Sequence, residues 1–209
     1  PNGRYNPEKG KVTFTTNHFS KYAIVFVKKT FNDIEDYPWA KKQIEVLASK
    51  GIINVTSATT YSPGLYVTRA DFISLLIRAL ELKADFSKNF DDVKATDYYY
   101  NAVGVAKELG ITVGTGNNKF DPKQHITRQD MMVLLVRALK IANIDLSEGS
   151  KKDIEKFIDA SSVSDYALEA VETLVKEGII VGSNNKISPR ENTTRAEAAV
   201  MMYRIYKLI

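Results

Sequence analysis

The chain has 209 residues, of which 44% are hydrophobic and 26% charged, and a chain of this length can bury about two-thirds of its unfolded surface. Its 29 basic and 25 acidic residues give a net charge of +4, and the basic residues are too scattered to favour nucleic acid as a partner. The absence of cysteine excludes disulfides and thiolate sites. No apolar run comes close to the length of about 20 residues that a membrane-spanning helix needs.

Residues 1–30 differ in composition from the rest of the chain. The stretches GKVTFTT (10–16) and KYAIVFV (21–27) are rich in Val, Thr, Ile, Tyr and Phe and predict the two strands of a β-hairpin. Because an isolated hairpin is only marginally stable in water, we expect these strands either to end a preceding β-rich domain or to pack on the remainder. The sequence starts at Pro1 without an initiator methionine or a signal-like segment, so we expect a fragment of a longer protein.

After residue 30 one unit occurs three times. Each copy opens with a Phe-x-Asp motif, and an arginine follows 38 residues after the phenylalanine. The phenylalanines are Phe31, Phe90 and Phe157, and the arginines are Arg69, Arg128 and Arg195. A register fixed in this way predicts an internal repeat. We expect the domains to be a β-strand segment at 1–30 and repeats at 31–89, 90–149 and 150–209.

Each unit predicts two helices. The first begins near an aromatic residue (Trp39 in the first copy) and ends at a glycine typical of helix C-termini (Gly51). After a loop containing a proline, the second helix, called the motif helix here, carries apolar residues at i, i+3, i+4, i+7 and i+8. One helical hairpin cannot cover its own apolar face, so we expect a mainly α, pseudo-threefold fold in which the three stripes share one core.

The motif that opens the second helix is TRAD at 68–71, TRQD at 127–130 and TRAE at 194–197. Its threonine is a good N-cap, and its acid stands at the capping-box position. The capping residues are Thr68, Asp71, Thr127, Asp130, Thr194 and Glu197. The arginine takes the first helical position, where the helix dipole disfavours a cation. Two explanations are about equally supported: an anion site made with unpaired amides, or pairing of the arginine with a neighbouring acid.

Three further sets of residues recur in the copies. The Phe-x-Asp aspartates could close Asx turns, which chemistry slightly favours, or accept hydrogen bonds from sugar hydroxyls. The aromatics at the first helix could belong to the core or stack on a sugar ring, and two loop glycines could let backbone approach a ligand. These residues are Asp33, Asp92 and Asp159, Trp39, Tyr98 and Tyr166, and Gly114 and Gly182.

Catalytic signals are missing from the sequence. His18 and His125 are the only histidines, and neither belongs to a metal-spaced cluster or a nucleophile motif. The stretch GTGNNK at 114–119 is too short for a phosphate-binding loop. We expect no enzyme activity, metal or cofactor in this part of the protein.

The ordered motifs resemble the S-layer homology (SLH) domain, which usually occurs as three tandem copies. The resemblance covers residues 31–209 and rests on Phe-x-Asp, the aromatic, the Gly-Ile-Ile stretch, the loop proline and the TRAE-type motif. It implies a three-pronged helical module that anchors exported proteins non-covalently to secondary cell wall polysaccharide bound to peptidoglycan. The polymer often carries pyruvylated N-acetylmannosamine, and the implied location is extracellular, in the cell wall or S-layer of a Gram-positive bacterium.

The resemblance also implies a site. Ligand would lie in grooves between neighbouring repeats, with the motif arginines meeting the pyruvate carboxylate and the aspartates and aromatics lining the grooves. Val55 stands where the other copies have glycine, so we expect a narrower groove there. Tyr98 and Tyr166 replace the commoner tryptophan, which reduces the stacking area. We therefore expect the three copies to contribute unequally.

Two alternatives remain open. The repeats or the N-terminal strands could form a protein assembly scaffold in a surface layer, with an oligomeric state that the sequence leaves undefined. Catalysis, if present in the full-length protein, would belong to an upstream module, since such anchors are commonly fused to hydrolases or lattice proteins.

Overall fold

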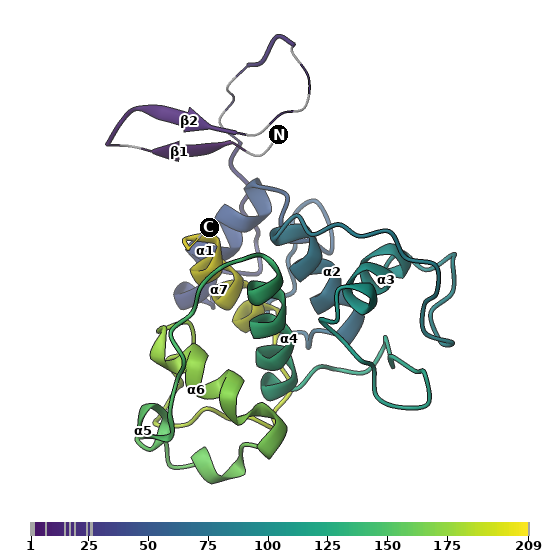
Figure 1. The fold of residues 1–209 in the computed structure, drawn as a ribbon. Helices are drawn as coiled ribbons and strands as arrows, with labels where there is room; N and C mark the ends of the chain where they lie inside the picture. Colours follow the sequence, from purple (N-terminus) through teal and green to yellow (C-terminus); the bar gives the residue numbers. More distant parts are fainter. Residues whose placement is uncertain are drawn as a thin grey trace.

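The computed structural model describes residues 3–208 except 7, 15, 17, 19, 24 and 26, and its fold is mainly helical, as the repeat pattern predicts (Figure 1). Two short strands come first, β1 (Arg4–Asn6) and β2 (Lys11–Thr13). The helices are α1 (Pro38–Ser49), α2 (Arg69–Ala79), α3 (Tyr100–Glu108), α4 (Arg128–Ile141), α5 (Lys151–Ile154), α6 (Leu168–Lys176) and α7 (Arg195–Tyr206). Two short 3-10 helices, η1 (Ala160–Ser162) and η2 (Asp165–Ala167), precede α6.

The N-terminal hairpin is present, but its strands are not the two expected. β1 pairs with β2 in antiparallel register, with Tyr5 opposite Val12, so only GKVTFTT supplies a predicted strand. In KYAIVFV the described residues 21–23, 25 and 27 form no strand, whereas 24 and 26 lie outside the described residues. Closing the short turn between β1 and β2 costs little loop entropy, which favours this local pairing. The Lys50 ammonium donates to the Gly3 carbonyl and connects the hairpin to the end of α1.

Each repeat pairs a first helix (α1, α3 or α6) with a motif helix (α2, α4 or α7). The motif helix of one repeat packs mainly against the first helix of the next: α2 against α3, α4 against α6, and α7 against α1. The last contact brings the C-terminal helix beside the first one (Figure 1). The repeats therefore form a closed ring, and each contact between a motif helix and the next first helix is called a seam here.

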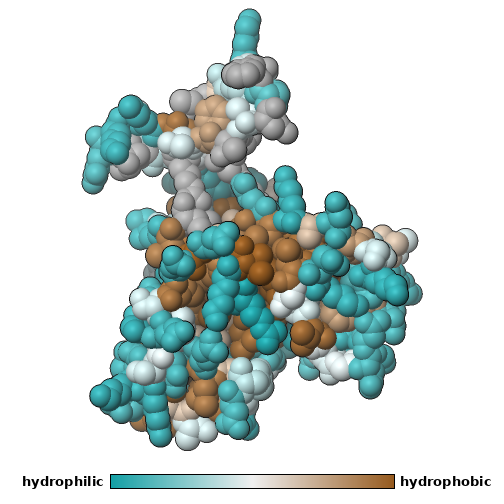
Figure 2. Space-filling model, viewed as in Figure 1, coloured by the Kyte–Doolittle hydropathy of each residue, from teal (hydrophilic) through white to brown (hydrophobic). Residues whose placement is uncertain are grey.

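The apolar stripes of the motif helices are buried as predicted. Phe72 and Leu76 of α2, and Met131 and Leu135 of α4, have no exposed surface. α2 packs against both α4 and α7, which joins the stripes in one core. Figure 2 shows hydrophobic residues gathered over the middle of the helical part and hydrophilic residues towards its edges.

A ring of backbone hydrogen bonds joins the three segments that precede the motif helices. Val67 N donates to Thr193 O at 2.9 Å, Thr193 N donates to Ile126 O at 3.0 Å, and Ile126 N donates to Val67 O at 3.0 Å. All three side chains are buried. Since each repeat both donates and accepts once, removing any repeat would leave two buried groups unpaired.

Candidate functional site

The first turn of each motif helix is closed by the neighbouring repeat. In α2, Arg69 N donates to Gln124 O at 2.9 Å and Ala70 N donates to Pro122 O at 3.0 Å, while the third amide, Asp71 N, donates to the Thr68 hydroxyl at 3.1 Å. α4 and α7 repeat this arrangement with the loops of the third and first repeats. Of the two explanations left open for the motif arginine, the one that uses unpaired amides loses those donors, because carbonyls of the neighbouring repeat and the N-cap hydroxyl already accept from them.

The motif arginines connect the repeats in the same cyclic order. Each Nε donates to a backbone carbonyl in the loop of the next repeat, between 2.8 and 2.9 Å away. The pairs are Arg69 with Phe120, Arg128 with Ile187 and Arg195 with Tyr61. Helix stability does not explain a cation at the first helical position, but these bonds do, because each arginine connects its motif helix to the next repeat. These bonds do not use the two terminal nitrogens of each guanidinium.

These terminal nitrogens differ in their surroundings. Arg128 Nη1 lies 2.9 Å from Glu197 Oε1 in an ion pair. Arg195 Nη2 donates to Asn54 O at 2.7 Å, and its guanidinium lies 4.4 Å from the Tyr61 ring centre. Arg69 is only 7% exposed and lies 5.0 Å from the Phe120 ring centre. No carboxylate of the described residues stands within ion-pair distance of Arg69.

Burial lowers the pKa of Arg69, and the charges of Asp130 and Asp121 act in the opposite direction. Arginine remains protonated in proteins because its ordinary pKa is above about 12. Arg69 is therefore a nearly buried cation whose nearest acids lie beyond ion-pair distance.

The motif acids meet the first-helix aromatics across two seams. The Tyr98 hydroxyl donates to Asp71 Oδ1, and the Tyr166 hydroxyl donates to Asp130 Oδ1, each at 2.6 Å. Burial and this hydrogen bond raise the pKa of Tyr98, and they raise the pKa of Tyr166 to about 12. The other oxygen of each aspartate accepts from the N-cap threonine. Both oxygens of each aspartate thus already accept a hydrogen bond from a neutral donor.

The third seam is built differently, because Trp39 has no hydroxyl to offer. Glu197 Oε2 accepts from the backbone and hydroxyl of Thr194, each at 2.8 Å, which completes a capping box. The longer glutamate places its second oxygen on Arg128.

Each seam therefore combines residues from all three repeats. Seam A joins Asp71, Tyr98 and Arg195, and seam B joins Asp130, Tyr166 and Arg69. In seam C, Glu197 meets Arg128, and Trp39 belongs to α1, which packs against α7. The pKa of Tyr98 is raised overall, and the positive charge of Arg195 opposes part of that rise. The charge of Arg69 opposes the rise in the pKa of Tyr166 in the same way. Arg128 and Glu197 touch directly.

The aromatics of the seams are open to solvent. Trp39 is 52%, Tyr98 70% and Tyr166 59% exposed. Of the two positions that the sequence left open, core or surface, the structure places all three rings largely on the surface. A ring fixed at one edge and open on a face can stack against an apolar or sugar surface.

The Phe-x-Asp aspartates form no local Asx turn, although the sequence slightly favoured one. Asp92 Oδ1 accepts from Phe120 N at 2.9 Å and Oδ2 accepts from Asp121 N at 2.8 Å. Asp33 and Asp159 hold the corresponding loop residues in the same way. Each clamp fixes a non-glycine residue with positive φ, which is 54° at Asp121. The aspartates thus position the loops whose carbonyls receive the arginines.

The two loop glycines are explained by packing within the protein. Gly114 has φ of 80° and Gly182 has φ of 70°. A Cβ at Gly114 would lie 2.3 Å from Lys119 O, and one at Gly182 would lie 2.5 Å from Phe157 Cε1. The chain's own loop and phenylalanine ring fill the space that a side chain would take. Val55, at the matching position of the first repeat, is partly buried against the core.

Sequence reasoning missed a second set of arginines, nine residues after the motif arginines. Arg78 Nη1 donates to Asn54 Oδ1 and Arg204 Nη1 to Ile179 O, each at 2.6 Å, and Arg137 Nη1 donates to Ile111 O at 3.4 Å. Each arginine holds the loop after the first helix of its own repeat. Their constant register in IRAL, VRAL and YRIY was the available signal.

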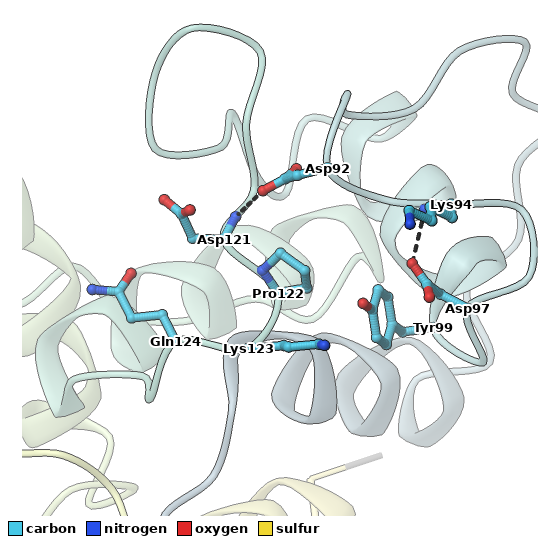
Figure 3. A pocket seen from close by; sticks show the side chains of 8 residues that line it. All are labelled: Asp92, Lys94, Asp97, Tyr99, Asp121, Pro122, Lys123 and Gln124. Atoms are coloured by element: carbon cyan, nitrogen blue, oxygen red, sulfur yellow. Dashed lines mark hydrogen bonds between the residues drawn. The ribbon is translucent and has the colours of Figure 1, made fainter.

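Two hollows stand out on the surface. One of about 580 Å³ lies in the second repeat (Figure 3). Its three carboxylates already accept hydrogen bonds, Asp92 and Asp97 from backbone amides and Asp121 from the Thr115 hydroxyl. The other, of about 540 Å³, lies between α2 and α3 in seam A, where Tyr98 and Arg78 line it. The side chains of the first hollow thus hold the loops in place, and the second hollow adjoins the candidate site.

The described part of the chain was found to contain neither a membrane-spanning helix nor a cluster of metal ligands. None of its helices combines the length and the apolar character required to cross a bilayer. Its His, Asp and Glu side chains form no group of three or more that could hold a metal ion.

A closed ring of three helical repeats with an arginine, an acid and an exposed aromatic in each seam defines a class of tandem-repeat binding modules. The sequence matches the S-layer homology domain at residues 30–73, 89–132 and 156–199, and the chain belongs to this family. Domains of this family are non-catalytic and bind cell wall polysaccharide. The match indicates a bacterial cell-surface or S-layer location.

Several curated proteins resemble the chain. It is 40% identical over 205 residues to an amylopullulanase of Thermoanaerobacterium thermosulfurigenes, covering 96% of this chain and 11% of that protein. It is 39% identical over 178 residues to the exoglucanase XynX of Acetivibrio thermocellus and 34% identical over 178 residues to the surface-layer 125 kDa protein of Lysinibacillus sphaericus. Each alignment covers 83% of this chain, and 16% and 14% of those proteins, respectively. The chain therefore spans a small part of these relatives.

Proposed function

We propose that this module anchors a larger exported protein to the cell wall by binding secondary cell wall polysaccharide at the seams, with acidic pyruvylated N-acetylmannosamine as the recognised sugar. The observation that carries the proposal is the combination, in seams A and B, of an exposed tyrosine with a motif arginine from a different repeat whose charge acts on that tyrosine. A ring face suits the apolar side of a sugar, and a guanidinium suits a carboxylate.

The cyclic architecture supports joint binding. Three seams on one rigid ring can engage neighbouring sugars of the same polymer, and the second contact then forms at a high effective concentration. Modest individual sites would in this way give firm attachment. The Phe-x-Asp aspartates contribute by holding the loops, with the remaining lone pairs of their oxygens open to sugar hydroxyls.

The proposal is tested with purified wall polysaccharide before and after removal of its pyruvyl groups. We expect the 209-residue chain to sediment with the native polymer and to bind the depyruvylated polymer at least about tenfold more weakly, because a lost charged hydrogen bond costs about 1.5 to 3 kcal/mol. Absence of binding to the native polymer would overturn the anchoring proposal, and equal binding to both forms would overturn the carboxylate mechanism.

A second candidate function is assembly with other subunits of a surface layer. It is favoured by the exposed apolar side chains Val113, Ile158 and Val181, which are 76%, 72% and 56% exposed. Concentration-dependent self-association in the absence of polymer, measured by analytical ultracentrifugation, would support it. A monomer at all concentrations that still binds the polymer would leave anchoring as the function.

The full-length protein is proposed to be a larger surface protein of a Gram-positive bacterium. Its relatives include proteins named as an amylopullulanase and an exoglucanase, which favours an upstream catalytic module. The sequence of the complete gene product tests this directly.

A further inference from the structure

The three seams differ in the partner given to the motif acid. In seams A and B the acid is an aspartate whose Oδ1 accepts from a tyrosine hydroxyl at 2.6 Å. In seam C the acid is Glu197 and the aromatic is Trp39, which has no hydroxyl. The free oxygen of Glu197 therefore accepts from Arg128 at 2.9 Å.

This difference determines which guanidinium is free for an external anion. Arg128 and Glu197 have side chains that are only 13% and 34% exposed, so solvent screens the pair less than it would a surface pair. A ligand carboxylate at Arg128 would have to displace Glu197 or lie beside a like charge. Seam C is thus already occupied by an anion of the protein.

Arg69 in seam B is the opposite case. It is 93% buried, since only 7% of its surface is exposed, and its Nε donates to Phe120 O at 2.9 Å. Within the described residues no carboxylate forms an ion pair with it. Three acids influence it, and each already accepts other hydrogen bonds. Asp130 accepts from Tyr166 and Thr127, and Asp121 accepts from Thr115. Asp92 accepts from the backbone amides of Phe120 and Asp121. A buried cation without an ion-pair partner gains most from an incoming anion.

Arg195 in seam A is intermediate. It forms no ion pair within the described residues, but two of its nitrogens already donate, to Tyr61 O and Asn54 O. Fewer of its donors are left for a ligand than in seam B.

Building on the proposed function, we propose that seam B is the principal carboxylate-binding site, that seam A is secondary, and that Glu197 acts as a built-in competing anion that keeps seam C weak. Glu197 and the tyrosine hydroxyls are then the residues that set the ranking of the seams. The ligand class is a sugar that carries a carboxylate.

The test measures binding of the 209-residue chain to purified pyruvylated wall polysaccharide by isothermal titration calorimetry. Arg69→Gln is expected to weaken binding by about tenfold or more, Arg195→Gln by less, and Arg128→Gln by under about twofold. Glu197→Gln keeps a capping-box residue and removes the competing charge, so we expect tighter binding. A loss of affinity largest in Arg128→Gln, or unchanged or weaker binding in Glu197→Gln, would overturn the ranking.

A second pair of variants leaves the arginines intact, in case Arg69→Gln fails to fold. Tyr166→Phe frees Asp130 Oδ1, whose charge already acts on Arg69, and should weaken binding. Tyr98→Phe is the matched control in seam A and should weaken binding less. Equal effects of the two variants would contradict the ranking.

The two proposals fail in distinguishable ways. If the unaltered chain does not bind the polymer, the anchoring function is wrong. If it binds but the variants rank differently, anchoring stands and only the assignment of seam B fails.

Discussion

Each seam has an inner part, made of the backbone ring and the arginine Nε bonds, and an outer part, made of the acid, the aromatic and the terminal guanidinium nitrogens. The three copies agree in the inner part and differ in the outer part. Around the ring of Val67, Ile126 and Thr193, the same backbone bonds and the same arginine Nε bonds occur in all three copies. Further out, seams A and B share a tyrosine–aspartate hydrogen bond that seam C replaces with an arginine–glutamate ion pair, and the terminal guanidinium nitrogens have different surroundings in each copy. The inner bonds close the ring, so each copy needs them, whereas the outer groups take no part in the closure and can differ without opening the ring.

The largest expected effect comes from breaking the inner part. Phe120 is fully buried, stacks 5.6 Å from Phe90 and lies under Arg69. We expect Phe120→Ala to lower the free energy of unfolding by about 3 to 5 kcal/mol, because it leaves a cavity. Chemical denaturation measures this, with Ile158→Ala as control, since Ile158 is 72% exposed. A loss no larger than that of the control would show that the loop does not support the ring.

A smaller effect is expected when a loop clamp is weakened. Asp92→Asn places an amide group where two backbone N–H groups need acceptors, so we expect a loss of about 1 to 3 kcal/mol. Asp36→Asn, at an exposed position, is the matched control for the lost charge. Equal stability of the two variants in urea titrations would contradict the clamp.

The ring itself can be improved at one position. Thr193 is fully buried, and its hydroxyl has no hydrogen-bond partner among the described residues, whereas the equivalent positions hold Val67 and Ile126. We expect Thr193→Val to raise the free energy of unfolding by about 1 kcal/mol, because an unpaired buried hydroxyl is removed. Thr112→Val is the matched control, since the Thr112 hydroxyl accepts from Gly114 N, and it should destabilise instead. The same sign in both variants would count against the argument.

The smallest effect concerns the outer part and appears only at high pH. Burial and the bond to Asp130 raise the pKa of Tyr166 to about 12, above the ordinary value of about 10. Because the folded pKa is raised, this stabilisation is present below pH about 10 and is lost as the pH rises through about 12. Tyr166→Phe should show a smaller alkaline loss in denaturation curves recorded across this range. Burial also raises the pKa of Tyr61 to about 12, but Tyr61 is present in the unaltered chain and in the variant. Identical denaturation curves for the two would therefore contradict the Tyr166–Asp130 bond.

Local features of the structure could be predicted from the sequence. Helical periodicity gave the buried stripes, and the glycines past the first helices have the expected left-handed φ, such as 69° at Gly51. Thr68 has the extended backbone of an N-cap and accepts from Asp71 N. These features depend on residues within a few positions of one another, so a single stretch of sequence contains all the information.

The partners across the seams could not be predicted in this way. The register of three copies indicated that the motif arginines matter, but not that Arg69 reaches Phe120, 51 residues away, or that Glu197 meets Arg128. The same three repeat sequences are compatible with any choice of which repeats contact each other. Only the closed ring fixes which repeat supplies each partner.

By itself, the sequence determined the number of repeats, the two main helices of each repeat and the type of residue at each seam, but not the short α5, η1 and η2 of the third repeat. Only the tertiary structure decided that the first-turn amides are already bonded and that one guanidinium carries an internal counter-ion while another is buried without one. The reason is physical: helices and caps form from local bonds, whereas a charge's partner and its burial depend on which distant segments the closed ring brings together.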